Sequence, residues 1–135
     1  MIEFVNVSKV YKTGTHALNN FSVSIDRGEF VFVVGPSGAG KSTFIKLLMR
    51  EEKPSSGEIY VNGQNLVRMK RRKVPYFRRT LGVVFQDFRL IPNMNVYDNV
   101  AFALRVTNVS GREIRNRVPY ILGLVGLSGK AKSLP

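Results

Sequence analysis

Residues 30–48 read FVFVVGPSGAGKSTFIKLL. The first five, Phe30–Val34, are all apolar, and a glycine-rich loop separates them from Phe44, Leu47 and Leu48, which recur at helical spacing. A continuous apolar run of this kind is typical of a strand that is buried on both faces of a parallel sheet. The order of strand, glycine loop and helix therefore predicts an α/β fold built around a phosphate-binding loop.

The loop itself, Gly35–Ser42, matches the pattern G-x-x-x-x-G-K-[ST]. Its glycines let successive backbone N–H groups point inward and leave room for an anion. A helix that starts near Gly40 adds the partial positive charge of its N-terminus. Lys41 is expected to contact the β- and γ-phosphates, and the hydroxyl of Ser42 is a hard oxygen ligand suited to Mg2+. The sequence thus predicts a site for ATP with Mg2+.

The composition is that of a globular chain and excludes several kinds of site. The chain has 135 residues, enough for one domain, with 44% hydrophobic and 22% charged residues. Because it has no Cys, disulfides, thiolate metal sites and cysteine catalysis are excluded. The longest apolar run is far too short to cross a bilayer, and the N-terminus lacks the features of a signal peptide. We therefore expect a cytoplasmic protein.

The net charge of +12 is high and is concentrated in residues 68–79, which we call the basic segment. Its basic residues are Arg68, Lys70, Arg71, Arg72, Lys73, Arg78 and Arg79. Three interpretations stay open: a solvated basic face, a nucleic-acid contact, or a contact with anionic lipid. Nucleic acid is the weaker of the two binding interpretations, because no recognised nucleic-acid motif accompanies the run.

Other strands are indicated by alternation of apolar and polar residues. Residues 2–10 alternate loosely, and Phe21–Ile25 alternates with serines, which predicts a half-buried strand. A short strand between two turns should have Ile59 and Val61 pointing inward. Leu81–Phe85 is a second candidate for a buried strand.

From about residue 95 the apolar spacing becomes helical. Val96, Val100, Ala101 and Leu104 form one stripe. A second helix is predicted to start at Ser110, where Glu113 three residues later completes a capping box. Pro119 falls inside that second helix and is expected to kink or break it.

Residues that would hydrolyse a nucleotide are not evident. Hydrolysis needs an acidic residue at the end of a buried strand and a group that positions water. Asp87 comes nearest, but Gln86 separates it from the apolar run, and the only histidine, His16, precedes the loop. Three classes therefore remain open at this point: an ATPase subunit, a small P-loop kinase, and a non-enzymatic module that binds nucleotide or polyanion.

In combination these features resemble the nucleotide-binding subunit of ABC transporters over essentially all 135 residues. Gly35–Thr43 has the family's Walker A form, Val83–Gln86 is similar to its Q-loop, and Tyr11 stands where the family places an aromatic ring that stacks on adenine. The resemblance implies that Ser42 and Gln86 bind Mg2+. It implies nucleotide contacts from Tyr11, Gly35, Pro36, Ser37, Gly38, Ala39, Gly40, Lys41, Ser42, Thr43 and Gln86.

Three strings are most similar to the members of this family that act in bacterial cell division: VPYFRR at 74–79, FQDFRLIP at 85–92 and VYDNVAFAL at 96–104. ATPases of lipoprotein release and of amino-acid import share parts of these strings. The resemblance implies a homodimer of nucleotide-binding subunits and an FtsX-like integral membrane subunit as partner. It places the pair at the cytoplasmic face of the membrane at the division site, where it would control peptidoglycan hydrolysis, and makes a nucleic-acid partner unlikely.

The sequence pattern of the family is longer than this chain of 135 residues. The chain corresponds to a partial α/β core at residues 1–88 and to the start of a helical subdomain at residues 89–135. The family's L-S-G-G-x signature, its Walker B strand ending in Asp-Glu and its switch histidine are not in the chain. We therefore expect no catalytic residue and no ATP turnover here, and we expect Phe30–Val34 and Leu81–Phe85 to leave apolar strand faces uncovered.

Overall fold

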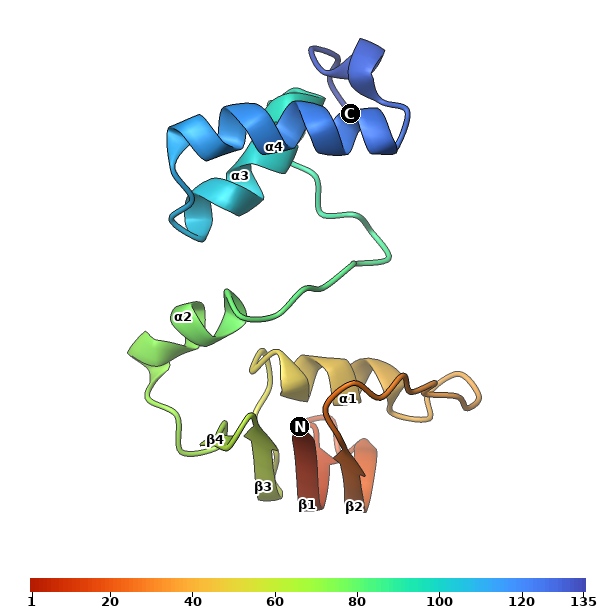
Figure 1. Ribbon diagram of the computed structural model, residues 1–135. Coiled ribbons are helices and arrows are strands. Elements are labelled where there is room, and N and C mark those ends of the chain that lie inside the picture. The colour runs from red at the N-terminus through yellow and green to blue at the C-terminus, as the bar shows by residue number, and fades with distance from the viewer. The chain divides into compact units, whose positions relative to one another are not determined.

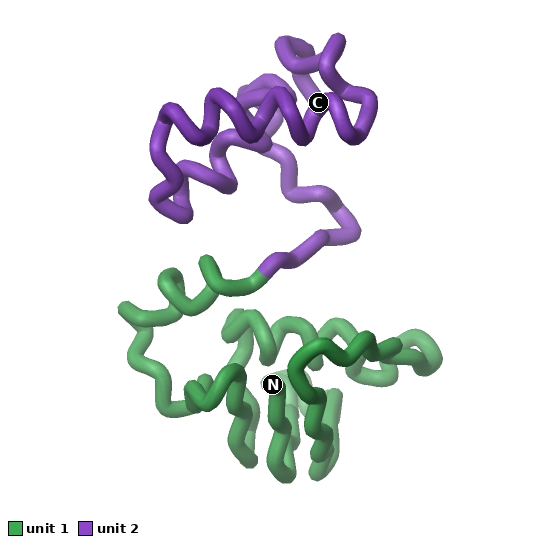
Figure 2. The backbone as a smooth tube through the Cα atoms, viewed as in Figure 1, with its two compact units in different colours: residues 1–81 green, residues 82–135 purple.

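The computed structural model describes residues 1–135, which form two compact units, Met1–Leu81 and Gly82–Pro135 (Figure 2). The first unit contains an antiparallel sheet with helices, and the second contains helices alone (Figure 1). No helix in the chain is both long enough and apolar enough to span a bilayer.

The sheet of the first unit has four strands in the order β2-β1-β3-β4, and all neighbouring strands are antiparallel. The strands are β1 (Ile2–Val10), β2 (His16–Ile25), β3 (Ser56–Val61) and β4 (Gln64–Asn65). In the register, Phe4 of β1 lies opposite Val23 of β2 and Ile59 of β3. The strands predicted from alternation are therefore confirmed, with Ile59 and Val61 pointing inward and both almost fully buried.

The core of the first unit forms where α1 (Lys41–Leu48) packs against this sheet (Figure 1). The ring of Phe44 stacks on Phe4 with 4.7 Å between the ring centroids, and Phe21 meets Phe44 edge-on at 5.9 Å. Leu47 is fully buried in the same cluster. The helical spacing predicted after the glycine loop is thus confirmed, and it anchors the helix by its aromatic face.

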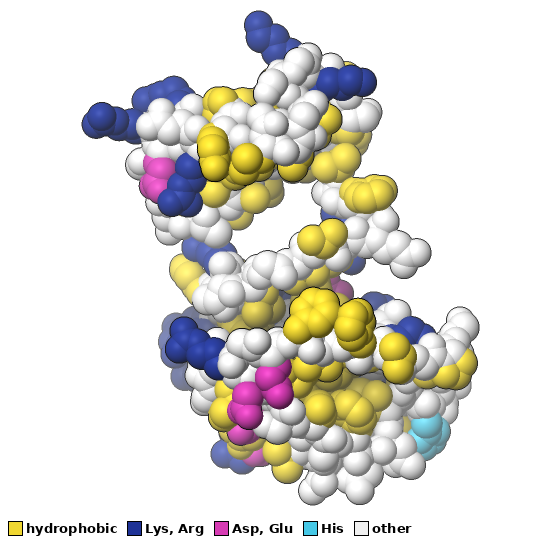
Figure 3. Space-filling view, turned by 45° about the vertical axis from the view of Figure 1, so that its right-hand side comes forward, with side chains coloured by type: hydrophobic (Ala, Val, Ile, Leu, Met, Phe, Trp, Pro, Cys, Tyr) yellow, Lys and Arg dark blue, Asp and Glu magenta, His cyan; other side chains and the backbone are white.

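The predicted buried strands at Phe30–Val34 and Leu81–Phe85 are wrong. Neither segment forms a strand, and no strand of the sheet pairs with either of them. Phe32 is 78% exposed and Val84 is 96% exposed. An apolar run becomes a buried strand only when neighbouring strands satisfy its backbone groups and other elements cover its faces, and the described strands do neither. Apolar side chains of both segments are exposed although neither segment forms a strand, and Figure 3 shows apolar side chains on the surface.

Two short helices complete the first unit, η1 (Arg71–Lys73) and α2 (Val74–Arg78). Arg78 closes the C-terminal end of α1, because its Nε donates to the Met49 carbonyl at 2.9 Å and its Nη2 donates to the Arg50 carbonyl at 3.1 Å. A guanidinium in this place satisfies carbonyls that the helix leaves unpaired and complements the negative end of its dipole.

The second unit is built on α3 (Val96–Val106) and α4 (Gly111–Leu124), followed by η2 (Ser128–Lys130). Both helices have side-chain N-caps: Asn95 accepts a hydrogen bond from the Asp98 N–H, and Ser110 accepts one from the Glu113 N–H at 3.2 Å. The helix start predicted at Ser110 is therefore confirmed. The core of this unit consists of Ala101, Ile114, Val118 and Leu122.

The helix break expected at Pro119 does not occur. The helix α4 continues through this residue to Leu124. Proline cannot donate to the carbonyl of Arg115, four residues earlier. Both residues are exposed, so water can bind this carbonyl in place of the missing N–H. The buried side of the helix, with Ile114, Val118 and Leu122, keeps its apolar packing.

We predict that Phe44→Ala destabilises the first unit by about 3–5 kcal/mol, because it removes a buried ring that packs on two others. The matched control is Phe30→Ala, which removes the same ring from a site that is 83% exposed and should change stability by no more than about 0.5 kcal/mol. Urea denaturation followed by far-UV circular dichroism measures both, and equal losses in the two variants would contradict the assignment of the core.

Candidate nucleotide-binding site

The glycine loop joins the extended segment at residues 30–34 to the N-terminus of α1. Residues 35–39 are exposed, and the Ala39 N–H donates to the Pro36 carbonyl at 3.2 Å inside the loop. The helix begins at Lys41, as predicted, with Gly40 as its N-cap. The structure therefore presents an exposed glycine-rich turn directly in front of a helix N-terminus, which is the arrangement that binds phosphate.

Gly40 is required by its conformation and by its neighbour. Its φ is 86°, a left-handed conformation, and its carbonyl accepts the first hydrogen bond of the helix from the Phe44 N–H at 2.8 Å. A Cβ at this position would lie 2.3 Å from the carbonyl oxygen of Ala17 and 3.0 Å from Cδ2 of Leu18. The backbone of the loop therefore packs directly against β2. The contact is too close for any residue that carries a Cβ to replace Gly40.

Lys41 places a positive charge across the loop. Its ammonium group donates to the carbonyl oxygens of Gly35 at 2.6 Å and Pro36 at 2.7 Å. Phosphate oxygens are charged acceptors and would bind the same ammonium more strongly than these neutral carbonyls do. The next residue, Ser42, is exposed on the first turn of α1, whereas Thr43 is buried. Lys41, predicted to contact phosphate, and Ser42, predicted to bind the metal, therefore lie on one helix turn.

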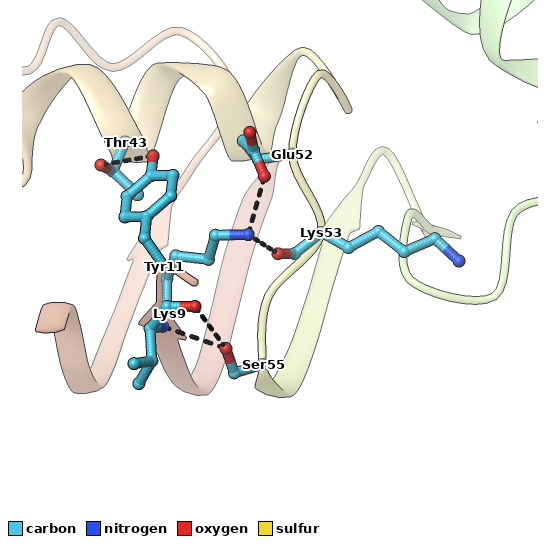
Figure 4. A network of polar contacts seen from close by, with 7 residues as sticks. Lys9, Tyr11, Thr43, Glu52, Lys53 and Ser55 are labelled. Carbon is cyan, nitrogen blue, oxygen red and sulfur yellow. Dashed lines mark hydrogen bonds and ion pairs between the residues drawn. The ribbon is translucent and has the colours of Figure 1, made fainter. Parts of the chain in front are cut away.

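Tyr11 is brought to the same helix turn from the end of β1. Its hydroxyl lies 3.1 Å from Oγ1 of Thr43, within hydrogen-bond distance (Figure 4). The ammonium group of Lys9 lies over the Tyr11 ring, 5.0 Å from the ring centroid. Of the residues predicted to bind nucleotide, Tyr11 and the Walker A stretch are thus brought together, although they are far apart in the sequence.

Lys9 belongs to this site and was missed by the sequence reasoning. It is only 9% exposed, and its ammonium donates to Oε2 of Glu52 at 2.7 Å and to the Lys53 carbonyl at 2.8 Å (Figure 4). A single lysine in an alternating strand is ordinarily assigned to solvent. The signal that could have found it is its register, because Lys9 follows the buried Val7 by two positions and so lies on the inward face of β1.

Gln86 lies in the second unit, on an exposed turn that starts at this residue. The turn is closed by the Phe88 N–H, which donates to the Phe85 carbonyl at 3.2 Å. The guanidinium of Arg89 lies 3.8 Å from the centroid of the Phe85 ring. The role of Gln86 at Mg2+ stays a prediction.

The metal ligand predicted in the first unit, Ser42, carries a neutral hydroxyl on an exposed helix turn. The chain has no group of three or more His, Cys, Asp or Glu side chains that could hold a metal ion. Mg2+ usually keeps several waters and takes its charged ligands from substrate phosphates, so such a hydroxyl fits Mg2+ delivered with a nucleotide better than a resident metal.

Comparison with known proteins assigns the family. The sequence profile of the ABC transporter family matches residues 18–135. The chain belongs to the ABC transporter family. The glycine loop and the start of α1 are therefore its Walker A motif.

Similar proteins include cell-division ATP-binding proteins named FtsE. The protein of Bacillus subtilis is 53% identical over 135 residues, and that of Escherichia coli is 46% identical over 135 residues. These matches cover all of this chain but 59% and 61% of the two relatives, so the chain spans about three fifths of their length. Among solved structures, a dimeric ATP-binding cassette, MJ0796, in a post-hydrolysis state bound to ADP and Pi, is similar with a TM-score of 0.90 and 35% identity. That match covers all of this chain and 62% of the cassette, and it shows the cassette fold.

A hollow of this ABC family member lies in the basic segment, and none of the residues that line it belongs to the Walker A motif. It measures about 1120 Å3 and is lined in part by Arg68, Lys70, Arg72, Lys73 and Tyr76. Arg68 pairs with Glu58 at 2.6 Å, and the pKa of that carboxyl is lowered first by the hydrogen bond from the Tyr60 hydroxyl and then by Arg68. In a smaller hollow beside it, burial and the neighbouring Arg78 lower the pKa of the Arg50 guanidinium.

We predict that Gly40→Ala destabilises the first unit by at least about 1 kcal/mol more than Gly38→Ala does. Both glycines have positive φ values, 86° and 81°, so both substitutions carry a similar conformational cost. Only at Gly40 does the added Cβ meet a backbone carbonyl, whereas nothing lies within 4 Å of it at Gly38. Urea denaturation of the two variants measures the difference, and equal stability would show that β2 does not support the loop as described.

Proposed function

We propose that the chain is the ATP-binding part of an ABC-type ATPase in an FtsEX-like complex that acts in bacterial cell division. The observation that carries the nucleotide site is that the Lys41 ammonium lies across the glycine loop while the Tyr11 hydroxyl contacts Thr43 in the helix turn that follows this loop. FtsE relatives from several bacteria, 46–53% identical over the whole chain, support the division role.

The Walker A motif would bind the triphosphate. The exposed N–H groups of the loop and the N-terminus of α1 would face the phosphate oxygens, and Lys41 would exchange its two carbonyl acceptors for the β- and γ-phosphates. Ser42 and Gln86 would be protein ligands of Mg2+, which neutralises charge on the phosphates when it is bound. Tyr11 would offer its ring face to the base, and that face suits any purine.

Hydrolysis is proposed for the whole protein and not for the residues of this chain. None of the chain's carboxylates clusters with others in a way that could hold the metal, and His16 is exposed on β2. In the whole protein ATP would be closed between two copies, and the dimeric form of the similar MJ0796 cassette, bound to ADP and Pi, supports such an assembly.

The proposed partner is an FtsX-like integral membrane subunit. The complex would lie at the cytoplasmic face of the membrane at the division site and couple ATP binding and hydrolysis to the control of peptidoglycan hydrolysis. Gln86 would link the nucleotide to this partner. The competing assignments are an ATPase of lipoprotein release or import, and a P-loop kinase in which Gln86 would have no special role.

We predict that Lys41→Ala weakens binding of Mg2+–ATP to the chain at least about tenfold, because it removes the charged donor that faces the loop. Lys46→Ala is the matched control, since Lys46 lies on the exposed side of the same helix and should leave affinity within about twofold. Isothermal titration calorimetry measures both. Unchanged affinity in the Lys41 variant, with Lys46→Ala also unchanged, would remove the basis for the nucleotide site.

A chimera tests hydrolysis and coupling. We predict that Bacillus subtilis FtsE whose matching segment is replaced by this chain hydrolyses ATP with Mg2+, and that Lys41→Ala abolishes this activity. Gln86→Ala should still bind ATP but remove the response of hydrolysis to co-reconstituted FtsX. Phosphate release is measured in liposomes with and without FtsX. An active chimera that does not respond to FtsX would favour another transporter class, and phosphate transfer to a small acceptor would favour a kinase.

A further inference from the structure

Lys9 is the most deeply buried charged side chain of the first unit, and its surroundings restrict its ammonium closely. Two oxygens accept hydrogen bonds from it, Oε2 of Glu52 at 2.7 Å and the Lys53 carbonyl at 2.8 Å. Lysine is rarely buried, because desolvation of the ammonium is costly unless partners compensate for it. Glu52 and the Lys53 carbonyl satisfy the ammonium, and they hold its charge under an aromatic ring and not at the surface.

The ring under which this charge lies is Tyr11, 5.0 Å from the ammonium to the ring centroid. The same tyrosine is held at its far end by the hydrogen bond between its hydroxyl and Thr43. Its backbone is held as well, because the Tyr11 N–H donates to the Thr15 carbonyl at 2.9 Å and its carbonyl accepts from the Gly14 N–H at 2.9 Å. The ring is therefore fixed at its backbone, at one face and at its hydroxyl.

The contacts form one chain of interactions, Glu52 to Lys9 to Tyr11 to Thr43 (Figure 4). Glu52 follows the C-terminal end of α1, and Thr43 lies in its first turn. The chain thus ties the end of β1 to both ends of the helix that carries the Walker A motif. The Tyr11 ring lies between the ammonium of Lys9 and the hydroxyl of Thr43, so the ion pair of Lys9 with Glu52 also restrains the ring.

We propose that Lys9 is a positioning residue for the nucleotide base: its ammonium occupies one face of Tyr11 and fixes the ring so that a purine stacks on the opposite face. This inference rests on the proposed ATP site. A cation on one face of a ring is attracted by the ring's quadrupole, and a ring that is already oriented loses less conformational freedom when a ligand binds. Lys9 has no contact with the loop that would hold the phosphates. Its effect should therefore appear in the part of the affinity that comes from the base.

The test compares two ligands on the full chain, Mg2+–ATP and Mg2+–tripolyphosphate, the second of which has the phosphates without the base. Lys9→Met should weaken binding of ATP by about threefold to tenfold and leave tripolyphosphate within about twofold. Tyr11→Ala should show the same selective loss, and adding Lys9→Met to it should cause no further loss. Lys41→Ala should weaken both ligands.

The matched control is Lys12→Met, which removes an exposed lysine three positions along the chain and should change neither affinity. Lys9→Arg, which can keep the contacts to Glu52 and the ring, should bind ATP as the original chain does. If the far-UV circular dichroism of Lys9→Met shows that this variant is unfolded, Glu52→Gln is the second variant. The Glu52 side chain is 36% exposed, and removing its charge leaves Lys9 in place but less firmly held. Glu52→Gln should again weaken ATP selectively.

Equal weakening of both ligands in the variants at Lys9 or Glu52 would overturn the inference in favour of a purely structural ion pair, and so would no change in either ligand. Neither outcome contradicts the proposed function, because both are measured against an original chain that binds ATP. A chain that binds tripolyphosphate and ATP equally well would overturn the role of Tyr11 and with it that of Lys9. A chain that binds neither would remove the proposed function itself.

Discussion

The docking of α1 on the antiparallel sheet is the interaction on which the rest of the first unit depends. Phe44 and Leu47 bury the inner side of the helix, and the stacking of Phe44 on Phe4 fixes where the helix lies along β1. Its N-terminus then presents the Walker A motif, and Gly40 seats that motif on β2. The geometry of the proposed phosphate site is therefore set by the apolar packing of this helix on the sheet.

The features that sequence could predict are those decided by neighbours in the chain. Alternation identified β1, β2 and β3 but not the two-residue β4, helical spacing identified α1, α3 and α4, and the loop pattern located the candidate site. Each of these follows from the period of apolar residues or from glycine chemistry within about ten positions. The cap at Ser110 is of the same kind, because its hydrogen bond reaches only to Glu113.

The predictions that failed concern partners that local sequence does not name. Phe30–Val34 has the composition of a buried strand, but composition reports the environment in which a segment would be stable and not whether strands lie beside it. The break expected at Pro119 was predicted from its lost N–H alone, whereas α4 continues with Ile114, Val118 and Leu122 buried along one side. Lys9 was overlooked because its partners, Glu52 and Lys53, lie more than forty residues away.

The geometry of the site also bears on its selectivity. Backbone N–H groups, a helix terminus and the charge of Lys41 recognise phosphate whatever base is attached, and each of them is stronger than a ring contact. Tyr11 offers a flat face and, with its hydroxyl held by Thr43, no free polar group that could read the edge of a base. Affinity should therefore depend mainly on the number of phosphates and on Mg2+, with the base adding a contact common to all purines. A site of this kind distinguishes a triphosphate from a diphosphate better than it distinguishes adenine from guanine.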